Sequence, residues 1–201
     1  MSRVDHLTRG TVGTAPPPCV ECMWWQTRPG GRPGSRERWT REAEDSFGPW
    51  GKLYAEDGRT IGQIQYGPSE VFPRALTLPA GPPSRDAVLI TCAYLTDATS
   101  PWVLQSLFLA AIGESKDRGY PALEAFGYRY GPGSGFADRF LAHRTIFPVD
   151  FLRDFGFQPQ RTAGRVELAR LDLRGLVPVA ETSLLERLKE RLAPVPAPAV
   201  R

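Results

Sequence analysis

The side chains of this sequence that could carry out chemistry are few, and its three thiols are the first candidates. Cys19 and Cys22 form a Cys-x-x-Cys pair, and Cys92 lies far from them in the sequence. A structural zinc site needs four ligands, usually two such pairs or one pair with two histidines. The two histidines, His6 and His143, lack zinc-finger spacing, so no metal is expected. The pair is predicted to be two semi-buried thiols at the start of a strand, with a redox pair as the alternative.

Acid–base chemistry would depend on Glu124 and His143. Glu124 lies within the apolar run Ala122–Phe126, where a carboxylate is costly to bury without a partner. It is therefore either a catalytic base or a strand-end carboxylate paired with Arg129 or Arg144. Histidine titrates near neutral pH and suits a general base. His143 is thus a second candidate base, and the alternative is a surface or capping histidine.

Hydrophobic periodicity and turn residues predict the elements that must position these side chains. Ser35 is a plausible helix N-cap, Asp57-Gly58 predicts a hairpin turn, and Gly119 predicts a helix end. The expected strands are Val20–Gln26, Trp50–Glu56, Thr60–Tyr66, Ala87–Leu95, Ala122–Phe126, one that starts at Phe157, and Arg165–Leu173. The expected helices are Arg36–Phe47, Pro101–Arg118, Pro148–Phe155 and Glu181–Leu192.

This order of elements predicts an α/β protein with a mixed sheet. The strand–helix–strand unit from Ala87 to Phe126 implies two parallel strands joined by a right-handed crossover. The hairpin implies antiparallel pairing elsewhere in the same sheet. The fold class expected is therefore a central mixed β-sheet with helices on both faces.

Length and composition limit the organisation of the chain. Its 201 residues suit one domain with tails: a flexible N-terminal arm over residues 1–18, a domain over 19–176, and a C-terminal helix with a proline-rich tail over 177–201. Neither a secretory signal nor a membrane-spanning stretch is recognised, so a cytoplasmic protein without a membrane partner is expected. The net charge of +3 comes without a basic stripe, so nucleic-acid binding is not favoured.

Several short motifs together resemble the GNAT acyltransferases, and among them a prokaryotic subset, which implies a bacterial protein. The subset opens with a Cys-x-x-Cys-x-Trp-Trp-like segment, here Cys19–Trp25. The later motifs are Gly62–Pro68, Phe72-Pro73-Arg74, Gly81–Ala87 and Phe155-Gly156-Phe157. The resemblance covers residues 19–173 and implies the GNAT fold.

The resemblance also implies an acetyl-CoA site between two splayed strands. In the GNAT fold the strand equivalent to Ala87–Leu95 separates from its neighbour, and the pantetheine arm enters the gap. The pyrophosphate lies at the N-terminus of the following helix, where N–H groups and the helix dipole favour an anion. The cofactor-binding residues carried over in this way are Ala93, Tyr94, Leu95, Thr99, Ser100, Trp102, Val103 and Leu104.

The sequence departs from the family pattern at both halves of this site. Thr99 replaces a basic or amide residue, and Trp102 and Leu104 stand where the family has glycines. Leu152 stands where many members have a tyrosine that acts as general acid.

Two other tyrosines, Tyr94 and Tyr128, could donate a proton to the leaving thiolate or bind substrate. Their alternative role is packing in the sheet. Cys92, on the same strand as Tyr94, is predicted to be a small buried hydrophobe rather than a nucleophile.

The predicted function is an acyl-CoA-dependent N-acyltransferase that transfers an acetyl group to a small-molecule or protein amine, and GNAT domains often form homodimers. Two alternatives stay open. The segment Thr99–Leu104 and Leu152 favour a binding or regulatory protein that kept the fold and lost turnover. A site without the pyrophosphate glycines would also suit a GNAT-like enzyme with another acyl donor.

Overall fold

The computed structural model describes residues 1–97, 100–131, 133, 135–142 and 145–176. The strands are β1 (Ser2–His6), β2 (Gly51–Glu56), β3 (Arg59–Pro68), β4 (Ala87–Leu95), β5 (Ala122–Tyr128), β6 (Phe147–Pro148), β7 (Gln158–Ala163) and β8 (Val166–Asp172). The helices are α1 (Pro17–Val20), α2 (Arg36–Phe47), α3 (Pro101–Asp117), α4 (Phe136–Ala142) and α5 (Val149–Asp154).

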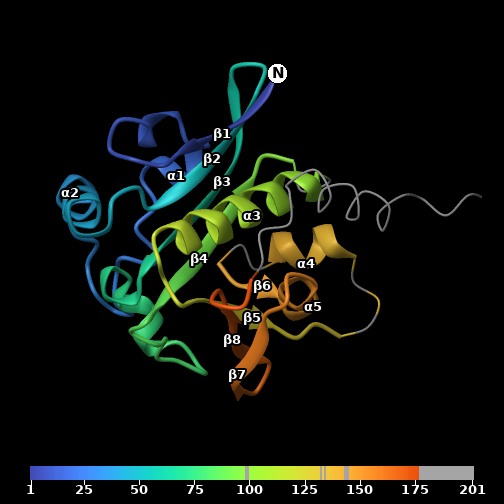
Figure 1. Ribbon diagram of the computed structural model, residues 1–201. Coiled ribbons are helices and arrows are strands. Elements are labelled where there is room, and N and C mark those ends of the chain that lie inside the picture. Colours follow the sequence, from blue (N-terminus) through green and yellow to red (C-terminus); the bar gives the residue numbers. More distant parts are fainter. Residues whose placement is uncertain (98–99, 132, 134, 143–144, 177–201) are drawn as a thin grey trace, which may run out of the picture.

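The strands form one mixed sheet in the order β1-β2-β3-β4-β5-β8-β7, with β6 paired to β5 (Figure 1). Among the described strands, β4–β5 and β5–β6 are parallel, and the other pairs are antiparallel. The predicted crossover from β4 through α3 to β5 is confirmed, and so is the mixed sheet.

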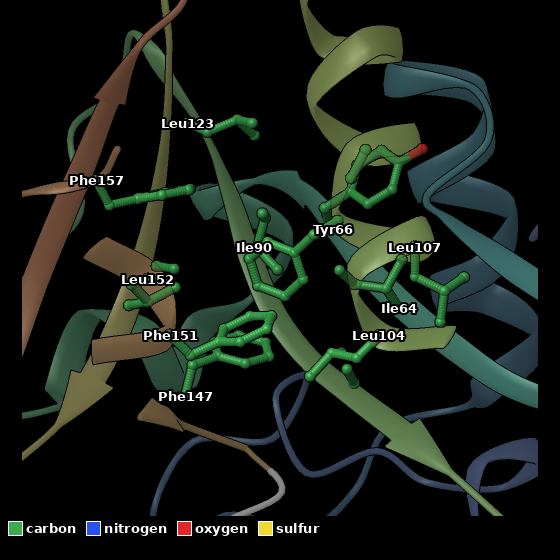
Figure 2. Close-up of a cluster of buried hydrophobic side chains, with 14 of the residues drawn as sticks. Ile64, Tyr66, Ile90, Leu104, Leu107, Leu123, Phe147, Phe151, Leu152 and Phe157 are labelled. Carbon is green, nitrogen blue, oxygen red and sulfur yellow. The ribbon is translucent and has the colours of Figure 1, made fainter. Parts of the chain in front are cut away.

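Helices and loops cover both faces of this sheet, and each face has its own hydrophobic core. On one face, side chains of α3 and α5 pack on the strands. Figure 2 shows Leu104 and Leu107 of α3 lying near Ile64 and Ile90 of the sheet, with Phe151 of α5 in the same cluster. On the other face, α1, α2 and the loops around them bury the remaining tryptophan-rich core.

Local sequence signals explain the elements that were predicted correctly. The Ser35 side chain accepts a hydrogen bond from the Arg38 N–H and so starts α2. Asp57 and Gly58 both have positive φ, at 48° and 79°, as the tight turn between β2 and β3 requires. Gly119, with φ of 78°, ends α3.

The prediction of a flexible arm over residues 1–18 is wrong. Residues Ser2–His6 form β1, which pairs antiparallel with the edge of β2, and Leu7 is completely buried. The strand escapes sequence analysis because it lies at the sheet edge with mostly exposed side chains. Its sequence therefore lacks the apolar alternation by which strands are recognised.

The predicted strand Val20–Gln26 is also wrong. Pro17 and Pro18 start the short helix α1 instead, as proline in a first helical turn allows. A turn follows, in which the Thr27 hydroxyl donates to the Met23 carbonyl. Trp25 is buried in the second core, so its apolar character reflects an anchored loop. The predicted helix Glu181–Leu192 lies outside the described residues.

Candidate functional site

The parallel ladder between β4 and β5 is short. It joins Ala87–Ile90 to Ala122–Ala125 and ends there. Beyond that point β4 continues to Leu95 along β3, while β5 turns to a new partner and pairs Gly127 with Phe147 of β6. The two strands therefore diverge toward their carboxyl ends, which is the splayed pair that the resemblance implied.

A bulge in β4 accompanies this divergence. Ile90 lies opposite Tyr66 and Cys92 lies opposite Gln65, so Thr91 is the extra residue between them. The Thr91 hydroxyl donates to the Gln65 carbonyl at 3.1 Å, which fixes the side chain of the extra residue against β3. Since a bulge bends its strand and increases its twist, it provides a physical reason for the separation of β4 from β5.

The N-terminus of α3 lies after the splayed end of β4. Ser100 precedes the helix, and Pro101 occupies its first position, where a missing N–H costs nothing. The side chains of Val103 and Leu104 are buried in the core below the helix, while Trp102 is 50% exposed. These bulky side chains therefore point into the core or to the surface. The first turn of α3 retains the positive dipole end that attracts an anion.

Two tyrosines lie on either side of the gap. Tyr94 is on the splayed part of β4 and packs against the second core. Tyr128 is at the end of β5, two residues after Phe126, which belongs to that same core. Side chains two apart on a strand share a face, so both phenols belong to the face that α1 and α2 cover. The ring of Tyr128 contacts Tyr130 at 4.9 Å between centroids.

Glu124 is fully buried in the paired part of β5, opposite Leu89, rather than in the gap. Its carboxylate accepts hydrogen bonds from the Ser84 N–H at 2.7 Å and the Ser84 hydroxyl at 2.6 Å. Arg170 of β8 donates a third, at 3.1 Å. The predicted pairing with Arg129 is wrong, because Arg129 donates to Glu167 instead.

Arg170 links this buried carboxylate to the surface. It also forms two hydrogen bonds to Asp86, at 2.8 and 3.1 Å. These bonds lower the pKa of Asp86 below its ordinary value. The resulting cluster connects the loop before β4 to β5 and β8, and it holds the closed end of the strands together.

The remaining predicted positions contribute little to the described site. Leu152 is buried and packs where a side chain on Gly127 would stand, so this place offers no hydroxyl. Ala93 and Leu95 lie on the splayed part of β4 with their side chains buried. His143 and Thr99 lie outside the described residues.

The sheet with its splayed central pair, covered by helices on both faces, is the GNAT fold. An N-acetyltransferase from Staphylococcus aureus Mu50 is 13% identical and aligns over 87% of this chain and 99% of its own, with a TM-score of 0.50. The yncA protein of Salmonella typhimurium, solved with its cofactor acetyl-CoA, also gives 0.50 at 13% identity, over 89% of this chain and 98% of its own.

At such identities the likeness concerns the fold. No family model matches the sequence, and no curated protein sequence matches it either. Among the described residues, no helix is long and apolar enough to cross a membrane, and no group of three or more His, Cys, Asp or Glu side chains is arranged to hold a metal ion.

Proposed function

We propose that this protein is an acyl-CoA-dependent N-acyltransferase that transfers an acetyl group to an amine. The observation that carries the proposal is the end of the β4–β5 ladder at Ile90 and Ala125, beyond which β4 continues to Leu95. A parallel pair in the middle of a sheet normally continues its hydrogen bonds. Interrupting it leaves backbone groups that a pantetheine amide can satisfy.

The residues present suit such a cofactor. Backbone groups of Ala93, Tyr94 and Leu95 would bond the pantetheine arm. The first turn of α3, from Ser100 to Leu104, together with Thr99, would receive the pyrophosphate through its N–H groups and dipole. Acyl-CoA supplies an activated thioester carbon, which an amine can attack.

Residues of the chain would then stabilise the developing negative charge and transfer protons. Backbone N–H groups at the β4 bulge would stabilise the oxygen that gains charge when the amine nitrogen bonds to the carbonyl carbon. When the C–S bond breaks, Tyr94 or Tyr128 would donate a proton to the leaving sulfur. His143 stays a candidate base, with a water relay as the alternative. The three hydrogen bonds to Glu124 favour a structural role for that side chain.

Calorimetry with acetyl-CoA tests the binding half of this proposal. Trp102→Glu places a negative charge at the N-terminus of α3, which suits the helix but repels a pyrophosphate. We expect binding to weaken about fivefold to tenfold, while Trp102→Gln, the neutral control of similar size, stays near the native affinity. Because Trp102 is half exposed, both variants should fold. Equal affinities for the two variants would argue against the helix N-terminus as the pyrophosphate site.

A CoA-release assay across a panel of amines tests the catalytic half. One of the variants Tyr94→Phe and Tyr128→Phe should lower kcat about a hundredfold with the affinity for acetyl-CoA retained. Full activity in both variants would remove the tyrosines from the mechanism.

A binding or regulatory protein without turnover is the second candidate. The buried Leu152 at the position of the usual tyrosine favours it. This alternative predicts that acetyl-CoA binds but that no amine in the panel releases CoA.

A further inference from the structure

The three cysteines of the chain come together around one arginine. Cys22 is exposed and Cys19 is buried at the end of α1, and Cys92 projects from β4 on the face that α1 covers. Arg36, the first residue of α2, lies within electrostatic range of all three thiols. Cys92 also lies close enough to Cys19 and Cys22 for the three thiols to interact electrostatically. Sequence spacing alone shows the Cys-x-x-Cys pair but neither Cys92 nor Arg36 beside it.

The turn that holds Cys19 and Cys22 is compatible with a disulfide. The Cys22 N–H donates to the Cys19 carbonyl at 3.4 Å, so the two residues are joined by one tight i→i+3 turn at the end of α1. Three residues of such a turn rise about 6 Å. Disulfides join residues whose Cα atoms are separated by about 4.4–6.8 Å.

Arg36 is fixed against this turn. Its Nη1 donates to the Cys22 carbonyl at 2.5 Å and lies 3.8 Å from the Met23 sulfur. Its Nε is buried and has no hydrogen-bond partner among the described residues. The bond to the Cys22 carbonyl therefore ties the first turn of α2 to the turn that carries both thiols.

Cys92 has the opposite character. Burial raises its pKa, and the neighbouring Cys19 and Cys22 add to this shift. Cys92 therefore remains a protonated thiol at neutral pH, and the exposed Cys22 is the cysteine that can react with a solute. Cys19, three residues away, is the nearest candidate to resolve the product.

We propose that Cys19 and Cys22 form a redox-active dithiol that exchanges with small disulfides such as glutathione disulfide. The Cys22 thiolate attacks one sulfur of the small disulfide, whose S–S bond breaks. The sulfur that leaves takes up the proton that Cys22 lost, and Cys22 is left in a mixed disulfide. Cys19 then attacks the Cys22 sulfur and gives its proton to the second small thiol as it departs. Two protein thiols are oxidised, and one small disulfide is reduced to two thiols.

Acid-quenched alkylation and peptide mass spectrometry test this exchange on the full chain in glutathione redox buffers. We expect a disulfide that joins Cys19 to Cys22 and returns to dithiol in reducing buffer. Cys19→Ser should stop at one glutathione attached to Cys22, and Cys22→Ser should form neither product. Cys92→Ser is the matched control and should behave as the native chain. The readout does not involve acyl transfer, so it is independent of the proposed activity.

Three outcomes would overturn the proposal. Both thiols could remain reduced in the most oxidising buffer, the disulfide could include Cys92, or purified protein could retain zinc that protects both thiols from alkylation.

Discussion

At the scale of single residues, the buried carboxylate of Glu124 is held by donors that a neutral side chain cannot satisfy. Glu124→Gln replaces one accepting oxygen by an NH₂ group, which would face either the Ser84 N–H or Arg170 together with the Ser84 hydroxyl. We expect the free energy of unfolding to fall by about 2–4 kcal/mol, measured by urea denaturation.

Asp86→Asn is the matched control for this substitution, because Asp86 pairs with the same Arg170 but is largely exposed. Asp86→Asn should lower the free energy of unfolding by less than about 1 kcal/mol. A Glu124→Gln variant that keeps native stability and loses turnover would identify Glu124 as the catalytic base after all.

Single residues differ in how much of their surroundings the sequence can predict. Glu124 was recognised as a buried carboxylate because it interrupts an apolar run. Its partners could not be recognised, because Ser84 and Arg170 approach it from a loop and from another strand. Leu152 was recognised as a departure from the family, whereas the convergence of Cys92 with Arg36 depends on how α1 packs over β4, which no local pattern encodes.

At the scale of elements, Glu114 ties α3 to the N-terminal strands. Its carboxylate forms ion pairs with Lys52 of β2 and Arg118 after α3, lies 3.4 Å from His6 of β1, and accepts a hydrogen bond from Tyr66 at 2.7 Å. Burial alone would raise the pKa of Glu114, but the bonds from Lys52 and Tyr66 and the two positive charges outweigh it, so the pKa is lowered.

Because the pKa of Glu114 is lowered in the folded protein, its carboxylate stabilises the fold at pH values above its ordinary pKa of 4.5. This stabilisation is lost as the pH falls through the pKa of the folded state. Glu114→Gln should therefore lower stability at pH 7 by about 2–4 kcal/mol, because Lys52 is left buried without its counter-ion. It should also flatten the acid limb of a stability–pH curve. The exposed Glu37→Gln should leave both features nearly unchanged. An equally steep acid limb in Glu114→Gln would contradict this account.

Two glycines provide a matched pair of tests of element packing. A Cβ on Gly51 of β2 would lie 2.2 Å from the Ile64 carbonyl oxygen, whereas one on Gly113 of α3 would meet nothing within 4 Å. Gly51→Ala should destabilise the protein by more than about 2 kcal/mol. Gly113→Ala should stabilise it by up to about 1 kcal/mol, since alanine favours a helix. Thermal unfolding measures both, and a similar effect of the two changes would contradict the strand packing described.

The elements that sequence analysis predicted correctly share strong local signals. β4 is continuously apolar, α2 has a serine N-cap and an apolar face, and the β2–β3 hairpin has Asp-Gly at its turn. β1 has no such signal, because an edge strand with exposed side chains is specified by its partner. The bulge at Thr91 and the early end of the β4–β5 ladder likewise depend on how β4 pairs with β3 and β5, and no local sequence pattern marks them. The splay itself was therefore expected from the family resemblance and not from the residues.

At the scale of the whole molecule, the two hydrophobic cores lie on opposite faces of the sheet. Between them, the ladder that joins β4 to β5 ends early, at Ile90 and Ala125. α3 packs against both strands on one face, and Trp25, from the loop after α1, stacks on Phe126 of β5 on the other. A homodimer stays a prediction, which light scattering of the purified chain would test.

Hydrogen exchange of backbone amides, followed by mass spectrometry with and without acetyl-CoA, locates the bound cofactor on the chain. A cofactor between the splayed strands should slow exchange in two segments, Ala93–Leu95 of β4 and Trp102–Leu104 at the start of α3, and leave the β2–β3 hairpin unchanged. No protection at saturating acetyl-CoA, or protection confined to other segments, would contradict a cofactor site between the splayed strands.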